Sequence, residues 1–312
     1  MTVADLTASA AVAALTPRRI GAHTFDFARR AAVMAVINRT PDSFSDGGAT
    51  FALEAALSRA QQAVAEGADW VDIGGMPFSP DTPEPSVAQE LDRVLPVVQA
   101  IRASSDVVIS VDTFRPPVAQ AVLEAGADVI NDVTGLGVPG MAQVIVEHQA
   151  TVVIAHSLAA PHQHLRAPSY RDVVAQVKAH LQRRVEAAVD AGIPVEQIVI
   201  DPGHDLNKNT RHSLELTRRC SELAATGLPL LVALSNKDFI GETLDRPHGQ
   251  RLAGSLAAAA LCVQAGARIL RVHEVAQTVD VVRMVEAVMG MREPAYLRHN
   301  IEGAAAGGGD DV

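Results

Sequence analysis

Eight short runs of apolar, mostly β-branched residues recur along the chain. They lie at residues 32–38, 70–74, 107–112, 128–132, 152–156, 197–201, 228–234 and 268–273. Longer stretches between them, such as 53–66, 87–102 and 173–191, repeat their apolar residues at helical spacing. A continuous apolar run has no polar face, which is typical of parallel strands buried on both sides. The pattern therefore predicts alternating strands and helices.

Three junctions between a predicted helix and the next strand share a Gly-Ala pair. They are Gly67-Ala68-Asp69, Gly126-Ala127-Asp128 and Gly266-Ala267-Arg268. Glycine suits the left-handed residue that commonly ends a helix, so each junction supports a helix that stops just before a strand. Eight such units in roughly 270 residues predict a closed (β/α)8 TIM barrel. A doubly wound open sheet is the alternative.

Nearly every apolar run ends in a polar residue. These residues are Asn38, Asp72, Asp112, Asn131, His156, Asp201, Ser235 with Lys237, and Arg271 with His273. In a β/α barrel the carboxyl ends of the strands converge on one mouth, where active sites lie. We therefore predict a single pocket. For Asp72 and His156, capping of the following helix is an equally good interpretation.

The composition excludes several classes of partner. The formal net charge is −10, which argues against nonspecific binding to nucleic acid or to an anionic membrane. Aromatic residues make up 3%, too few for a base-stacking platform. The sequence contains no run of about 18 uncharged apolar residues, so it predicts no membrane span. The N-terminal basic pair follows the apolar stretch, the reverse of a secretory signal.

The two cysteines, Cys220 and Cys262, have no metal-binding spacing and make no disulfide framework. We expect reduced packing residues in a cytoplasmic protein. The tail from Gly303 is glycine-rich. We therefore predict a flexible N-terminal segment at residues 1–20, one barrel domain at 21–295 and a flexible tail at 296–312.

Residues 38–48 read NRTPDSFSDGG, which by itself predicts a mobile polar loop able to hold a metal or close over a ligand. This segment closely resembles the first signature of the dihydropteroate synthases. Matching segments follow in the same order: Gly67-Ala68-Asp69 with Asp72-Ile73-Gly74-Gly75, Ser110-Val111-Asp112-Thr113, Ile130-Asn131-Asp132-Val133, Asp201-Pro202-Gly203, Ser235-Asn236-Lys237 with Phe239-Ile240-Gly241, and Arg271-Val272-His273-Glu274. The resemblance spans about residues 30 to 290, so the chain is identified as a member of this family or of its pterin-binding superfamily.

The resemblance implies a folate-pathway condensation of 4-aminobenzoate with a hydroxymethyl-dihydropterin pyrophosphate. A buried carboxylate can accept two hydrogen bonds from a pterin edge, and the resemblance gives that role to Asp201. The implied pterin set is Asp112, Asn131, Asp201 and Lys237, and the implied catalytic set is Lys237, Asp201 and Arg271. Asn38, Arg271 and His273 would hold the pyrophosphate, with Mg²⁺ near Asn38. Ser235 and Phe78 would contact the aminobenzoate, and a homodimer through C-terminal helices is implied, with the Ala-rich helix 252–265 suited to close packing.

The second family loop, usually Gly-Gly-Glu-Ser-Thr-Arg-Pro-Gly, departs from the pattern. Here Met76, Phe78 and Ser79 stand where a Glu, a Thr and an Arg are usual, and Pro77 and Pro80 stiffen the loop. Loss of an arginine beside a dispersed anionic charge costs on the order of 10²–10³ in rate.

Further changes affect other loops. Asp205 and Asn207 replace glycines of the segment that in the family often continues Gly-Phe-Gly-Lys, so side chains stand where backbone and ligand approach. Asn236 replaces a second arginine. Arg39 replaces a small apolar residue and is a candidate to restore positive charge.

We therefore hypothesise a dihydropteroate synthase homologue with weak or no synthase activity that still binds pterin or aminobenzoate analogues such as sulfones and sulfonamides. A fully active synthase is one alternative. Another transferase of the pterin-binding superfamily, such as one that moves a methyl group from a reduced folate, is the other.

Overall fold

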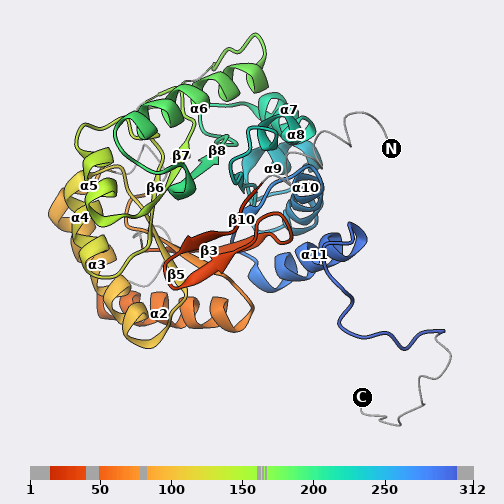
Figure 1. Cartoon of the computed structure of the whole chain (residues 1–312), viewed down its shortest axis with the longest axis horizontal. Helices are drawn as coiled ribbons and strands as arrows, with labels where there is room; N and C mark the ends of the chain where they lie inside the picture. Colours follow the sequence, from red (N-terminus) through yellow and green to blue (C-terminus); the bar gives the residue numbers. More distant parts are fainter. Residues whose placement is uncertain are drawn as a thin grey trace.

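A computed structural model describes residues 15–39, 49–77, 83–159, 163, 165 and 167–300. Eight parallel strands stand inside a ring of helices (Figure 1). The strands are β3 (Ala32–Asn38), β4 (Trp70–Gly74), β5 (Val108–Asp112), β6 (Val129–Asp132), β7 (Thr151–Ala155), β8 (Ile198–Asp201), β9 (Leu231–Ala233) and β10 (Ile269–Val272). The helices are α2 (Ala49–Ala65), α3 (Val87–Ser104), α4 (Pro116–Glu124), α5 (Met141–His148), α6 (Val173–Asp190), α7 (Thr210–Arg218), α8 (Cys220–Ala224), α9 (Asp238–Leu244), α10 (Leu252–Gln264) and α11 (Val275–Val288), with a 3₁₀ turn at Val195–Gln197.

The sheet closes on itself. Its order is β8-β7-β6-β5-β4-β3-β10-β9, and every neighbouring pair is parallel. Ile200 of β8 forms a parallel bridge with Leu230, just before β9, and its N–H donates to the Pro229 carbonyl at 3.1 Å. The predicted TIM barrel is confirmed, and the open-sheet alternative is wrong.

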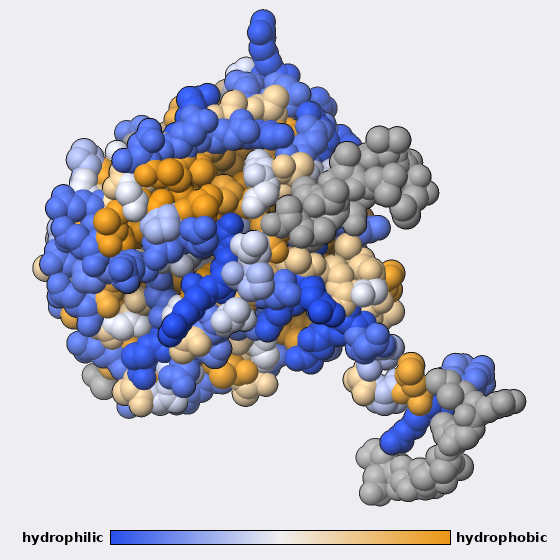
Figure 2. Space-filling model, viewed as in Figure 1, coloured by the Kyte–Doolittle hydropathy of each residue, from blue (hydrophilic) through white to orange (hydrophobic). Residues whose placement is uncertain are grey.

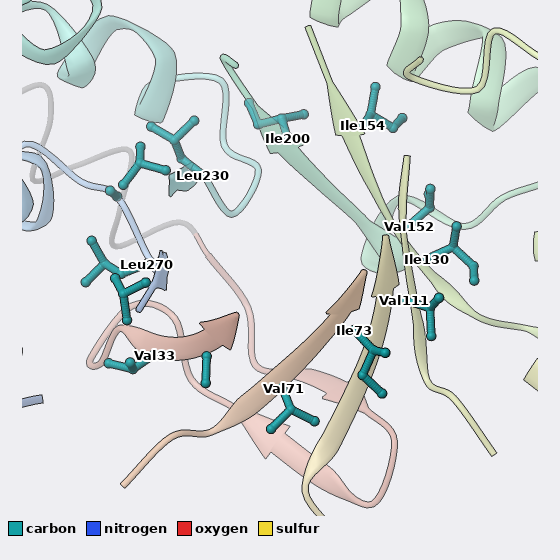
Figure 3. Packing of buried hydrophobic residues seen from close by; sticks show 14 of the residues in the cluster. Val33, Val71, Ile73, Val111, Ile130, Val152, Ile154, Ile200, Leu230 and Leu270 are labelled. Carbon is teal, nitrogen blue, oxygen red and sulfur yellow. The ribbon is translucent and has the colours of Figure 1, made fainter. Parts of the chain in front are cut away.

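Side chains alternate along the strands between two apolar layers. One set, which includes Val33, Val71, Val111, Ile154 and Leu270, points outward against the helices (Figure 3). The other set fills the lower barrel interior and comprises Ala32, Met34, Trp70, Val108, Val129, Val153, Val199, Leu231, Ala233 and Ile269. Burial on both faces explains why the strands read as continuous apolar runs.

A hairpin closes the bottom of the barrel. It consists of β1 (Arg18–Ile20) and β2 (His23–Phe25), which pair antiparallel. Phe25 packs against Trp70 with ring centroids 5.8 Å apart. Buried Arg18 donates to the carbonyls of Val195 and Ile198, both at 2.9 Å. Residues 15–20 therefore pack against the barrel, and β1 lies inside the N-terminal segment that the sequence analysis ended at residue 20. Two three-residue strands carry too little pattern to be seen in sequence.

The other end of the chain leaves the barrel. After α11 it runs away as an extended segment (Figure 1), in which Tyr296 and Leu297 are exposed. Residues 301–312 of the predicted tail lie outside the described residues. Hydrophilic residues cover much of the face in Figure 2. Among the described helices, none has the length and apolar character needed to cross a bilayer.

Candidate active site

The upper half of the barrel interior is polar because the inward positions change character along each strand. Moving up by two residues keeps a side chain on the same face. This step leads from Trp70 to Asp72, from Val108 to Ser110 and Asp112, from Val129 to Asn131, from Val199 to Asp201, and from Ile269 to Arg271. These strand-end residues therefore face one mouth above an apolar plug. His156, also a predicted strand end, lies three residues after inward Val153 and packs against Tyr170 and His180 instead.

Asp72 is the hub of this polar layer. Its fully buried carboxylate accepts from Arg271 Nε at 2.6 Å, from Ser110 Oγ at 2.6 Å and from Asn131 Nδ2 at 3.2 Å. Asp72 thus holds groups from three other strands and caps no helix. A buried carboxylate with one cation and two neutral donors is well satisfied.

Arg271 also binds a second carboxylate. Its Nη2 donates to Asp112 Oδ2 at 3.1 Å. Burial lowers the pKa of Arg271, but the Asp72 and Asp112 carboxylates outweigh that effect and raise its pKa above the ordinary value. Burial raises the pKa of Asp112 to about 7, against the opposing charge of Arg271 and with help from Asp72. Asp72, Asp112 and Arg271 therefore form one coupled network of charges at the base of the mouth.

Asp201 and Lys237 lie across the barrel mouth from Asp72 and Asp112. Asp201 is buried at the end of β8, and its Oδ1 accepts from the Gly203 N–H at 2.7 Å. Burial raises the pKa of Asp201, while Lys237 opposes the rise. Lys237 Nζ donates to the His204 carbonyl, and burial lowers its pKa. The predicted pterin residues Asp112, Asn131, Asp201 and Lys237 therefore come from β5, β6, β8 and the residue before α9.

The segment after β8 adopts the backbone that its replaced glycines would favour. Asp205 and Asn207 have left-handed φ values of 62° and 50°, which Asp and Asn tolerate better than other residues with side chains. Asp205 accepts from Ser213 Oγ at 2.7 Å and from the Phe239 N–H at 3.3 Å. Asn207 donates to Ser157 Oγ at 2.9 Å and accepts from the Leu165 N–H at 3.0 Å. Both side chains thus bind protein groups at the place where the sequence analysis expected backbone and ligand to approach.

The rim residues bind one another. Ser235 Oγ lies 2.9 Å from His273 Nδ1 and donates to Glu274 Oε2 at 2.8 Å. His273 lies at the rim, and desolvation of its imidazole, together with the charge of Arg271, lowers its pKa. Asn236 donates to Glu274 Oε1 at 3.4 Å. Asn38 is exposed at the end of β3, and Phe78 lies outside the described residues.

Arg39 is directed onto α3. Its Nη1 donates to the carbonyls of Arg93 at 2.6 Å and Asp92 at 3.3 Å. Pro96 lies inside α3 and has no N–H, so the Asp92 carbonyl four residues earlier lacks its helical donor. Arg39 fills that vacancy, and these bonds do not place its charge in the mouth.

Sequence reasoning left the role of Asp72 open between the pocket and a helix cap, and it gave Lys208 and Glu274 no role in the site. Asp72 carries a signal, because it stands two residues after buried Trp70, on the inward face. Lys208 is buried beside the ends of β7 and β8 and contacts His156. Neither Lys208 nor Glu274 has a pattern signal of its own, because each depends on contacts distant in sequence.

The described residues fit a magnesium ion only in part. No group of three or more His, Cys, Asp or Glu side chains among them could enclose an ion. Mg²⁺ commonly binds through one or two protein oxygens together with substrate phosphates and water. The Asn38 amide oxygen at the rim could supply one such ligand.

The chain matches a known protein family over most of the barrel. The pterin binding enzyme profile matches residues 34–273. The chain belongs to the pterin-binding enzyme family. It is 46% identical over 271 residues to the inactive dihydropteroate synthase 2 of Mycobacterium tuberculosis, covering 85% of each chain. It is 40% identical to the dihydropteroate synthase of Escherichia coli, covering 84% of this chain and 93% of that one.

Solved structures of the family superpose closely. The Xanthomonas albilineans dihydropteroate synthase with 4-aminobenzoic acid has a TM-score of 0.82 at 40% identity, covering 88% of this chain and 99% of that one. The Yersinia pestis enzyme in a sulfonamide complex has a TM-score of 0.83 at 38% identity, covering 89% and 100%. The chain is thus a dihydropteroate synthase homologue in sequence and in fold, and its relatives include active and inactive members.

Proposed function

We propose that this protein retains the pterin-binding half of a dihydropteroate synthase mouth and has weak or no synthase activity. Asp112, Asn131, Asp201 and Lys237 would bind the pterin edge, with Asp201 as its main acceptor. Lys237, Asp201 and Arg271 are the groups available for chemistry. Sulfones and sulfonamides are candidate ligands, since the related Yersinia pestis enzyme binds a sulfonamide.

The main support for weak synthase activity is that the arginines near the mouth are already bound to protein groups. A pyrophosphate leaving group needs cations that are already aimed at the position where its charge develops. Arg271 is held by two carboxylates, and Arg39 donates to α3. Arg59 pairs with Glu66 and donates to the His273 carbonyl. Each of these guanidinium groups would have to leave a protein partner to serve a pyrophosphate.

Two neutral groups add to this deficit. Asn236 stands where the family usually has an arginine, and its amide binds Glu274. The lowered pKa of His273 favours its neutral form near neutral pH. Asn38, Arg271 and His273 thus remain the proposed pyrophosphate residues, with Mg²⁺ near Asn38, but they form a weak anion site. Ser235 and Phe78 stay candidates for the aminobenzoate, with Ser235 already engaged by Glu274.

The experiment separates pterin binding from pyrophosphate binding. Calorimetry with 6-hydroxymethylpterin should give measurable affinity, whereas the pyrophosphorylated pterin with Mg²⁺ should bind no more tightly. Addition of 4-aminobenzoate should give turnover at least about 10²-fold below that of the Escherichia coli enzyme measured alongside. Ordinary turnover would establish the active-synthase alternative. Absence of all pterin binding, with activity on a reduced methyl-folate, would favour the other transferase.

A homodimer and a cytoplasmic location are part of the same proposal. Leu261 of α10 and Met284 and Val288 of α11 are 58%, 64% and 73% exposed, on helices that pack against each other. Hydrophobic surface on this side of the molecule is visible at the right of Figure 2. A second copy would bury these side chains, and sedimentation of Leu261→Asp should show loss of the dimer. The buried, unpaired thiols of Cys220 and Cys262 suit a reducing compartment.

A further inference from the structure

Lys208 is a buried ammonium group at the carboxyl ends of β7 and β8. It is 7% exposed, and its Nζ has four acceptors. These are His156 Nδ1 at 3.0 Å and the carbonyls of His156, Gly203 and Leu206 at 3.3, 2.8 and 3.1 Å. A buried charge of this kind is tolerated only where it is well hydrogen-bonded.

These acceptors belong to two adjacent strand ends. His156 follows β7, and its N–H donates to the Asp201 carbonyl at 3.0 Å. Gly203 follows β8, and its N–H donates to the Asp201 carboxylate at 2.7 Å. Lys208 therefore binds the carbonyls of both residues whose N–H groups hold Asp201.

The backbone is packed tightly at this point. Gly203 has a left-handed φ of 68°, and a methyl group there would lie 2.1 Å from the His156 carbonyl oxygen. The two strand ends meet without an intervening side chain. The Lys208 ammonium offsets the repulsion that the converging carbonyl oxygens would otherwise create.

We propose that Lys208 is a positioning residue for Asp201: its buried positive charge clamps the ends of β7 and β8 together and keeps the Asp201 carboxylate anionic for ligand binding. Lys208 does not itself reach the ligand, because its donors are taken by protein acceptors. Where it concerns ligand affinity, the proposal rests on the proposed pterin site.

Other charged and titratable groups surround the pair and enter any pH profile. They are His156 after β7, Tyr170 and His180 on the α6 side, His204 and Asp205 after β8, His212 on α7, Lys237 before α9 and Arg271 on β10. Burial lowers the pKa of Lys208 to about 7, with Asp201 opposing the shift and Lys237 adding to it. Asp201 and Lys208 therefore influence each other's protonation directly.

The chain has three lysines, Lys178, Lys208 and Lys237, so lysine side-chain NMR resolves each one. In Lys208→Gln, which keeps hydrogen-bond donors but no charge, the titration midpoint of the Asp201 carboxyl, followed by carbon NMR of the side-chain carboxyls, should rise by about one pH unit or more. Lys178→Gln on α6 is the matched control and should leave the midpoint in place. The reciprocal variant, Asp201→Asn, should lower the Lys208 midpoint.

Ligand binding gives the second readout. With 6-hydroxymethylpterin as the probe, Lys208→Gln should bind about tenfold more weakly near pH 7 and regain affinity as the pH rises. A purely structural role would weaken binding equally at every pH, and that parallel profile would overturn the proposal. An unchanged titration midpoint of Asp201 in Lys208→Gln, together with an unchanged midpoint of Lys208 in Asp201→Asn, would overturn it too. If the wild type binds no pterin, the proposed function fails, while the NMR coupling still decides the role of Lys208.

Discussion

Arg271 Nε lies 2.6 Å from Asp72 Oδ2, joining β10 to β4 across 199 residues of sequence. The guanidinium reaches past β3, which separates the two strands in the sheet. Because Asp72 is fully buried, the pair is stabilising only while both partners remain. Arg271, the arginine proposed to bind an anionic leaving group, thus also stabilises the fold through this ion pair.

Replacement of Asp72 by Asn should therefore be costly. The amide keeps the shape of the carboxylate but leaves Arg271 with Asp112 alone, so the free energy of unfolding should fall by about 3 kcal/mol. Urea denaturation at neutral pH measures it. Glu215→Gln, which breaks surface pairs with Arg218 and Arg219, is the control and should cost under about 1 kcal/mol. Equal effects of the two variants would contradict the hub role of Asp72.

The Arg39 contact predicts a coupling with Pro96. Arg39→Ala should lower the free energy of unfolding by about 1 kcal/mol, because it removes donors from the carbonyls of Asp92 and Arg93. In a Pro96→Ala background the restored N–H serves the Asp92 carbonyl, so the same change should cost less. A double-mutant cycle measures the difference. Additive effects, or a loss of pterin-pyrophosphate affinity in Arg39→Ala, would return Arg39 to the list of ligand cations.

The altered second loop predicts a gain of function. The double variant Phe78→Thr, Ser79→Arg should bind the pyrophosphorylated pterin about tenfold or more tightly, since a charge-assisted hydrogen bond contributes about 1.5–3 kcal/mol. Calorimetry with Mg²⁺ measures the gain. The matched variant Phe78→Thr, Ser79→Gln has similar bulk without the charge and should show none. Affinity for 6-hydroxymethylpterin should be the same in the wild type and both variants. If the arginine variant binds the pyrophosphorylated pterin no more tightly than the wild type, the altered loop is not the cause of weak binding.

His156 predicts sensitivity to acid. Burial lowers its pKa to about 2, with Lys208 and His180 adding to the effect, whereas an unfolded histidine titrates near 6.5. The folded state therefore binds fewer protons between these values, and the stability present above pH 6.5 is lost as the pH falls through that window. The slope for one such group is up to about 1.4 kcal/mol per pH unit.

His156→Asn should flatten that slope. The Asn oxygen can still accept from Lys208 but does not titrate in this range. Denaturation between about pH 7 and pH 5 measures the change. His299→Asn, in the exposed C-terminal segment, is the control. A wild-type slope retained in His156→Asn would assign the acid sensitivity to other groups.

The pattern of apolar and polar residues predicted much of the fold. Apolar runs with helical stretches between them predicted all eight strands, and β3 and β4 match the predicted runs residue for residue. The reason is physical: strands buried on both faces must be apolar throughout, and polar residues are tolerated only at the mouth. The polar strand ends in the sequence therefore indicate Asp112, Asn131, Asp201 and Arg271 as residues of the mouth.

Tertiary structure decided the partners. Sequence could not tell whether Asp72 caps a helix or binds Arg271, because the choice depends on β10 closing beside β3. It could not tell whether Arg39 serves a ligand or the carbonyl left open by Pro96, nor that Lys208 binds the ends of two strands. Periodicity determines which face a side chain occupies, but hydrogen bonds and ion pairs act over a few ångströms, and only closure of the barrel brings those groups within reach.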